Sequence, residues 1–160
     1  MDQRFAQEPF VQPSFKKILA GVCGLALLTT GFAQTNVGFT RIEDVIYGRK
    51  FGTALTLDVL RPAKPNGYGV AVMVSGGWFS SHDGVGYVAI AYKPLMDRGY
   101  TVFAVVHGSQ PKFNVTEIVP DIHRAIRFIR HNAGKYGVNP DKLGITGGSA
   151  GGHLSLTMAV

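Results

Sequence analysis

From residue 37 onward, the apolar and polar positions of the chain follow first the period of strands and then that of helices. Residues 54–60 alternate apolar and polar side chains, as strands with one buried face do, and residues 40–47 form a second stretch that we interpret as a strand. The stretch 48–52 between them contains two glycines and predicts a hairpin turn. We therefore expect an antiparallel pair of strands at the start of the domain.

Two continuous apolar runs, residues 69–74 and 101–106, come next. Runs of this length between turn residues are typical of parallel strands that are buried on both faces. Residues 87–98 lie between them and have helical spacing, with Pro94 predicting a kink or a helix start. We interpret this unit as a β-α-β crossover.

A second helix is predicted from about Pro120 to Lys135, because apolar residues recur there at helical spacing and proline is favoured in a first turn. Gly137 is expected to close it, and the Asn-Pro-Asp turn at 139–141 leads into a short strand, residues 142–146. The alternation predicts an α/β fold: a mostly parallel sheet with an N-terminal antiparallel hairpin and helices on both faces.

The N-terminal segment has the pattern of a secretory signal peptide. A pair of lysines precedes an uncharged apolar run, residues 18–33, which ends in small residues. This run is shorter than the roughly 20 residues that a membrane-spanning helix needs. We expect residues 1–33 to be a signal peptide cleaved after Ala33, residues 34–160 to be the exported domain, and the protein to be secreted or periplasmic without a stable membrane span. A buried core helix is the alternative interpretation.

Composition narrows the function classes. The chain has 160 residues, 46% of them hydrophobic, which suits one globular domain with a real core. The net charge is +6, but the basic residues are scattered, so we expect no nucleic-acid partner. The single cysteine, Cys23, excludes an internal disulfide, and no His/Cys or His/Asp spacing in the sequence indicates a metal site. No cofactor is implied.

The first candidate catalytic motif is Gly147-Gly148-Ser149-Ala150-Gly151. It has G-x-S-x-G spacing and lies between an apolar strand and a following apolar segment. In this motif the serine occupies a tight, strained strand-to-helix turn, and small neighbours let the turn pass close to adjacent strands. Ser149 is therefore the candidate nucleophile. The alternative is a glycine-rich turn that binds an anion or only connects two elements.

A second glycine-rich stretch, Ser75-Gly76-Gly77-Trp78, follows the first buried strand. Acyl transfer creates an oxyanion, and small residues let backbone amides converge on it from this loop and from the residue after the nucleophile. We nominate Gly76, Gly77 and Ala150 as the oxyanion hole. A merely flexible turn is the alternative.

Over about residues 42–160 the chain resembles the N-terminal half of α/β-hydrolase-fold esterases and lipases, especially the acetyl- and feruloyl-esterase-like and hormone-sensitive-lipase-like groups. The segments that carry the resemblance are 44–48, 57–62, 75–78, 121–130 and 147–154. One departure is that Val74-Ser75 stand where these families usually have His-Gly. The resemblance implies a triad acid and histidine after the serine, so with Val160 as the last residue we expect an α/β-hydrolase fold truncated after the nucleophile turn.

The histidines and acids already present are given other roles. We interpret His153 as structural, His82 as a loop residue, and His107 as a residue that either lines the site or caps its strand. The remaining candidates are assigned to helix surfaces, a helix start and a turn: His123, His131, Asp121 and Asp141.

Three hypotheses follow. The first is an exported carboxylic-ester hydrolase that forms an acyl-enzyme on Ser149 and acts on a small-molecule or carbohydrate-linked ester. The second is a prolyl-oligopeptidase-like serine peptidase, which shares this half of the fold. The third is a catalytically inactive truncated remnant or binding module.

Overall fold

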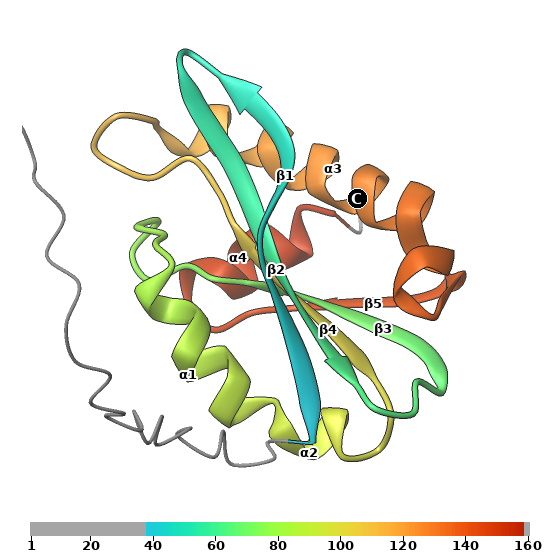
Figure 1. Cartoon of the computed structure of the whole chain (residues 1–160). Helices are drawn as coiled ribbons and strands as arrows, with labels where there is room; N and C mark the ends of the chain where they lie inside the picture. The colour runs from blue at the N-terminus through green and yellow to red at the C-terminus, as the bar shows by residue number, and fades with distance from the viewer. Residues whose placement is uncertain (1–37, 159–160) are drawn as a thin grey trace, which may run out of the picture. The chain divides into compact units, whose positions relative to one another are not determined.

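The computed structural model describes residues 38–158, so the expected signal peptide lies outside the described residues. Five strands form one sheet in the order β1-β2-β4-β3-β5, with α-helices α1–α4 and a short 3-10 helix, η1, between and around them (Figure 1). The element bounds are β1 Phe39–Lys50, β2 Thr53–Pro62, β3 Gly67–Met73, α1 Asp83–Ala91, α2 Lys93–Met96, β4 Thr101–Val106, α3 Val115–Asn132, η1 Ala133–Tyr136, β5 Val138–Thr146 and α4 Ala150–Leu156.

The sheet combines two kinds of pairing. β1 pairs antiparallel with β2, which confirms the expected hairpin, and β2 pairs antiparallel with β4. β3 lies between β4 and β5 and is parallel to both. The crossover is confirmed as well, since α1 and α2 connect the parallel strands β3 and β4 and α2 starts at Lys93, next to Pro94.

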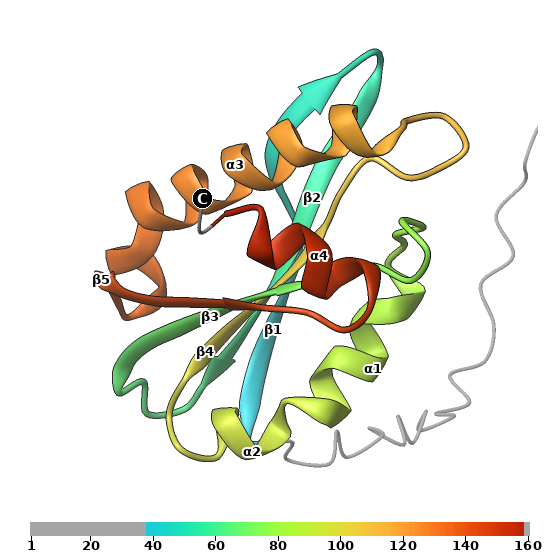
Figure 2. The same ribbon diagram turned by 180° about the vertical axis from the view of Figure 1, so that it is seen from behind.

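Helices cover both faces of the sheet, as the hydrophobic pattern predicts (Figures 1 and 2). Strand β4 illustrates the two layers: Phe103 and Val105 belong to the core under α3 and α4, whereas Val102 and Ala104 belong to the core under α1 and α2. All four side chains have no exposed surface. The continuous apolar run 101–106 is therefore explained by burial from both sides.

The second helix begins earlier than the sequence analysis predicts. α3 starts at Val115 because Asn114 caps it: the Asn114 side chain accepts a hydrogen bond from the Glu117 amide, and the Glu117 carboxylate accepts one from the Asn114 amide. This reciprocal pair satisfies two amides that a helix start leaves free. Pro120 lies inside the helix, one turn later. Gly137 ends η1 in a left-handed conformation, φ 73°, as its role as a helix terminator requires.

The last strand also begins earlier than predicted, at Val138 rather than at residue 142. Val138 pairs with Gly67 and Leu143 with Gly69, so the strand is irregular between these two pairs. The turn chemistry expected at 139–141 is found inside this irregularity, where the Asp141 amide donates to the Asn139 side chain.

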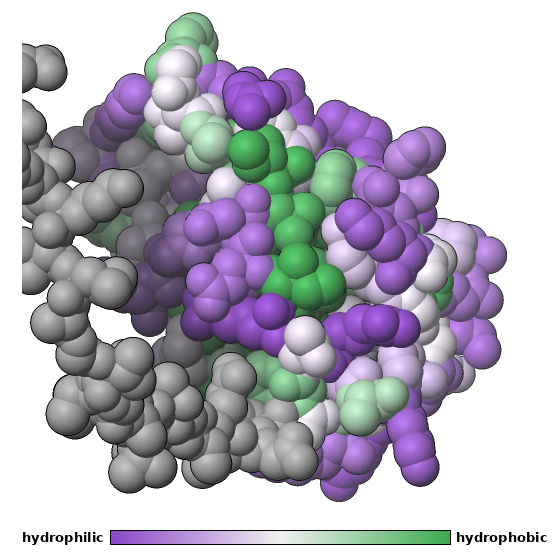
Figure 3. All heavy atoms as spheres, viewed as in Figure 1, coloured by the Kyte–Doolittle hydropathy of each residue, from purple (hydrophilic) through white to green (hydrophobic). Residues whose placement is uncertain are grey.

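Strand β1 forms one edge of the described sheet and is bent. Its register against β2 shifts between Ile42 and Val45 and again between Ile46 and Gly48, which is the behaviour of a bulged strand. Figure 3 shows a band of apolar residues on this face over β1, where Ile42 and Ile46 are partly exposed. The first shift places Asp44 in a left-handed backbone conformation, φ 54°.

The carboxyl ends of β3, β4 and β5 meet at one edge of the sheet, because these three strands are parallel. Three loops therefore come together there: residues 74–82 after β3, residues 107–114 after β4 and residues 147–149 after β5. Open α/β sheets bind ligands at this edge. Both glycine-rich motifs of the sequence lie on it.

Candidate active site

Ser149 lies at the turn between β5 and α4 in a strained conformation. Its φ of 50° and ψ of −120° are unusual for a residue with a side chain, and the residue is exposed. Although Ser149 stands at the N-cap position of α4, its hydroxyl makes no capping hydrogen bond. The hydroxyl is therefore presented to solvent, as a nucleophile requires.

The glycines around Ser149 are needed for space. A Cβ atom on Gly147 would lie 2.5 Å from the carbonyl carbon of Gly151, and one on Gly151 would lie 2.6 Å from the backbone oxygen of Met73 in β3. Backbone atoms cannot move aside as a flexible side chain can, so both positions require glycine. A Cβ on Gly148 would meet nothing within 4 Å. The turn therefore passes close to strand β3, as its small residues predict.

The loop after β3 is a closed turn. The Gly76 amide donates to the Phe79 carbonyl at 3.0 Å, and the Phe79 amide donates to the Gly76 carbonyl at 2.9 Å. The Gly76 amide is thus already hydrogen-bonded in this structure. The Gly77 amide, by contrast, has no acceptor among residues 38–158, and neither does that of Ala150, the first residue of α4.

Ser80 fastens the end of this loop to the sheet. Its hydroxyl donates to the Val74 carbonyl at 2.5 Å and accepts from the His107 amide at 3.2 Å, and its own amide donates to the Ser109 hydroxyl at 3.0 Å. The Gln110 amide adds a hydrogen bond to the Trp78 carbonyl. The loops after β3 and β4 are thereby held together.

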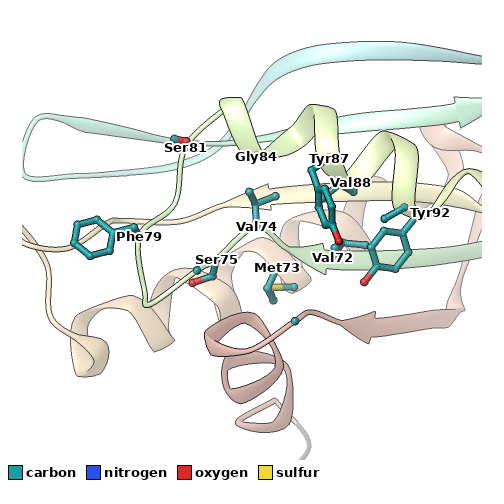
Figure 4. Close-up of a pocket in the computed structure, with 13 residues that line it drawn as sticks. Val72, Met73, Val74, Ser75, Phe79, Ser81, Gly84, Tyr87, Val88 and Tyr92 are labelled. Atoms are coloured by element: carbon teal, nitrogen blue, oxygen red, sulfur yellow. The ribbon is translucent and has the colours of Figure 1, made fainter.

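The structure brings the two glycine-rich motifs together. The rings of Trp78 and His153 meet edge to face, with centroids 5.9 Å apart. Gly76 and Gly148 both line a cleft of about 600 Å³ that runs between α1 and the end of β3. Figure 4 shows this cleft, with Ser75 and Phe79 on the loop, Tyr87 on α1 and Tyr92 directly after that helix. Its walls are largely apolar.

Two titratable residues near this edge are buried, and one of them, Asp121, has a role that differs from its sequence interpretation. Asp121 does not start a helix: it lies inside α3, buried, 2.6 Å from the Lys50 ammonium, and it accepts a hydrogen bond from the Gly108 amide. His107 is buried at the end of β4, with Nδ1 2.6 Å from the Gly108 carbonyl. Burial lowers the pKa of His107 below its usual value of 6.5, so the ring is neutral at pH 7.

The other histidines lie at or near the surface. His131 and His153 are exposed and His123 is partly exposed. Among residues 38–158, no histidine is hydrogen-bonded to the Ser149 hydroxyl.

One cluster of titratable residues was not predicted from the sequence. His82, which we interpreted as a loop residue, lies against the carboxylates of Asp44 and Asp58, and one ligand atom from each of the three residues lies within 4.8 Å of the others. One signal was available: Asp58 is a charged residue in the middle of an apolar strand, and it has no exposed surface. A buried carboxylate requires partners.

None of the helices within residues 38–158 has the combination of length and apolarity needed to cross a membrane.

Comparison with known proteins identifies the family of this chain. Residues 57–160, which include both glycine-rich motifs, match the BD-FAE family. The probable carboxylic ester hydrolase LipM of Mycobacterium tuberculosis is 30% identical over 120 residues, which are 73% of this chain and 28% of LipM. The acetylxylan esterase of Xylanibacter ruminicola is 38% identical over 96 residues, 59% of this chain and 19% of that enzyme.

The fold is matched by solved structures. A truncated form of a carbohydrate esterase from gut microbiota superposes with a TM-score of 0.66 at 28% identity, covering 75% of this chain and 43% of that one. The expected α/β-hydrolase fold is thus confirmed, and the chain spans less than half the length of each of these three proteins. On its sequence and its fold, the chain belongs to the BD-FAE family.

Proposed function

We propose that this chain carries the nucleophile and oxyanion donors of an exported carboxylic-ester hydrolase. The observation that carries the proposal is the strained, exposed Ser149, whose hydroxyl is free of local hydrogen bonds and whose turn lines the same cleft as the loop after β3. A serine in this setting at the carboxyl edge of a parallel sheet suits acyl transfer. The esterase relatives support an ester substrate, either a small molecule or one linked to a carbohydrate.

In the proposed reaction, the Ser149 oxygen forms a bond to the ester carbonyl carbon while its proton passes to a general base. The bond to the leaving alcohol then breaks, and the alcohol departs with that proton. Water attacks the acyl-enzyme, which releases the carboxylic acid and regenerates the serine. In the families that the chain resembles, the base and the acid that orients it follow the serine in the sequence.

The oxyanion is assigned to backbone amides. Gly77 and Ala150 are the two nominated residues whose amides have no acceptor among residues 38–158. Gly76 would join them only if its hydrogen bond to Phe79 opened. Loss of one such donor typically reduces kcat by about 10²–10³-fold.

Export is part of the same proposal. The lysine pair and apolar run of residues 1–33 support a cleaved leader and a secreted or periplasmic location. N-terminal sequencing of the protein recovered outside the cytoplasm is expected to start at Gln34. A mature protein that retains residues 1–33 in the cytoplasm would contradict this part.

The activity is tested by hydrolysis of p-nitrophenyl acetate and of an aminoacyl p-nitroanilide, with this chain and with the product of the gene read beyond codon 160. We expect turnover of the ester in preference to the amide, and a loss of at least about 10³-fold in Ser149→Ala. Ser155→Ala is the matched control, because Ser155 lies on α4 and bonds only the Gly151 carbonyl. Full turnover in Ser149→Ala would refute the proposal, and preference for the amide would favour the peptidase hypothesis.

A further inference from the structure

His82 joins the loop after β3 to the β1–β2 hairpin. It stands at the N-cap of α1, three residues after Phe79, and its neighbours Ser81 and Gly84 line the cleft. Its side chain makes no capping hydrogen bond. The ring instead reaches across to the hairpin, which is far away in the sequence.

The contacts of the His82 ring are short and involve both nitrogens. Nε2 lies 2.9 Å from the Asp44 carboxylate and 2.8 Å from the Thr56 hydroxyl. Nδ1 lies 3.5 Å from the Asp58 carboxylate. The ring is therefore held between two strands of the hairpin, with Asp44 on β1 and Thr56 and Asp58 on β2.

The hairpin residues that contact His82 are themselves held by other interactions within the hairpin. Asp58 has no exposed surface, and its Oδ2 accepts a hydrogen bond from Nε of Arg41 at 2.7 Å and forms an ion pair with Nη2 at the same distance. Its Oδ1 accepts from the Asp44 amide at 3.1 Å, at the bulge where Asp44 has φ 54°. Such a backbone conformation costs of order 1 kcal/mol and persists only where its surroundings enforce it. Arg41 and Asp58 thus hold the bulge that presents the Asp44 carboxylate to His82.

This geometry does not suit a metal ion. Although one ligand atom from each of the three residues lies within 4.8 Å of the others, each ring nitrogen already has a partner: Nε2 contacts Asp44 and Thr56, and Nδ1 faces Asp58. The negative charge of Asp58 is also already compensated by Arg41.

The geometry does not suit a proton relay from the Thr56 hydroxyl through His82 to Asp58 either. The Asp44 carboxylate can only accept a hydrogen bond, so Nε2 carries a proton when it bonds Asp44 and cannot at the same time remove one from the Thr56 hydroxyl. A structural linkage is the arrangement that uses every contact.

We propose that His82 is a positioning residue for the reaction on Ser149: its contacts with Asp44 and Asp58 anchor the start of α1, and with it the cleft side of the loop that holds Gly77 and Trp78. This inference rests on the proposed function for its catalytic consequence. Ser80 holds the same loop from the β4 side, so the loop is held at both flanks. Oxyanion donors act only when they are already aligned, so loosening one flank lowers kcat more than it weakens substrate binding.

The test uses a reporter inside the loop. Trp78 is the only tryptophan of the 160 residues, and its indole nitrogen is buried. In the 160-residue chain, His82→Ala is expected to raise the acrylamide quenching constant of Trp78 at least twofold and to shift its emission to the red. His82→Gln keeps one N–H donor for Asp44 and is expected to restore part of the effect. His131→Ala, at an exposed position on α3, is the control and is expected to match wild type.

A second variant covers the case in which His82→Ala does not fold. Asp44→Asn removes the charge that faces His82 but keeps a residue type that tolerates a left-handed backbone, and Asp44 is well exposed. Asp44→Asn is expected to raise the acrylamide quenching constant of Trp78, as His82→Ala does. In the product read beyond codon 160, both variants are expected to lower kcat about tenfold with KM within twofold of wild type.

The outcomes separate this inference from the proposed function. Unchanged quenching of Trp78 in both folded variants would overturn the role of His82, whatever the protein hydrolyses. Raised quenching with a normal kcat would also overturn it, because positioning would then have no effect on the reaction. Raised quenching in a protein whose wild type hydrolyses no ester would support the anchoring contact and refute the reaction proposed for Ser149.

Discussion

The strained backbone at Ser149 predicts an unusual order of stability for two substitutions. Ser149→Ala removes the hydroxyl but keeps the Cβ atom, whereas Ser149→Gly removes both. A residue in a sparsely populated conformation such as φ 50°, ψ −120° stores about 2 kcal/mol, which glycine releases. Glycine also loses about 1 kcal/mol through the greater freedom of the unfolded chain. The glycine variant should therefore be more stable than the alanine variant by about 1 kcal/mol.

Ser155 provides the matched control, because it is a serine on the same helix but in ordinary helical structure. There the order reverses, and Ser155→Gly should be less stable than Ser155→Ala by about 1 kcal/mol. Urea denaturation of the four variants measures both differences, and each corresponds to a shift in Tm of about 2–4 °C. If Ser149→Gly is less stable than Ser149→Ala, as at position 155, the backbone at Ser149 is unstrained and the reasoning is wrong.

Three further predictions concern the surroundings of the site. Gly151→Ala should cost about 1–3 kcal/mol in urea denaturation, because its Cβ would lie 2.6 Å from the Met73 oxygen, whereas Gly148→Ala, which has open space, should stay within about 0.5 kcal/mol of wild type. Asn114→Ala should lower the free energy of unfolding by about 1 kcal/mol through loss of the α3 cap, and an unchanged Tm would contradict this. Burial lowers the pKa of His107, so as the pH falls below 6.5 the unfolded chain binds a proton before the folded chain does. The free energy of unfolding should then decrease by up to about 1.4 kcal/mol per pH unit until the pH reaches the lowered pKa. An equally steep decrease in His107→Gln would refute this.

The fold was predictable where local pattern and burial agree. The run 101–106 is the observed β4 because its apolar side chains, residues 102–106, pack alternately into the two cores. The start of α3 was placed too late because Pro120 was taken as a first-turn residue, although Asn114 and Glu117 have the spacing of a capping box. The start of β5 was misplaced because the turn at 139–141 is an irregularity within a strand.

The site was predictable only in part. The neighbourhood of the two glycine-rich loops follows from parallel strands whose carboxyl ends share an edge. The contact between His82 and Asp44 does not follow from any local pattern, since it depends on a bulge that gives Asp44 a positive φ. The hydrogen bond that occupies the Gly76 amide is likewise a property of the folded turn.

The reactivity of the Ser149 hydroxyl is the most direct test of the proposed function. The product of the gene read beyond codon 160 would be incubated with a fluorophosphonate and digested, and the modified residue located by mass spectrometry. We predict a single phosphonylated serine, Ser149, with no modification in Ser149→Ala and normal modification in Ser155→Ala. Modification at another serine, or persistent labelling of Ser149→Ala, would contradict the assignment of Ser149 as the nucleophile.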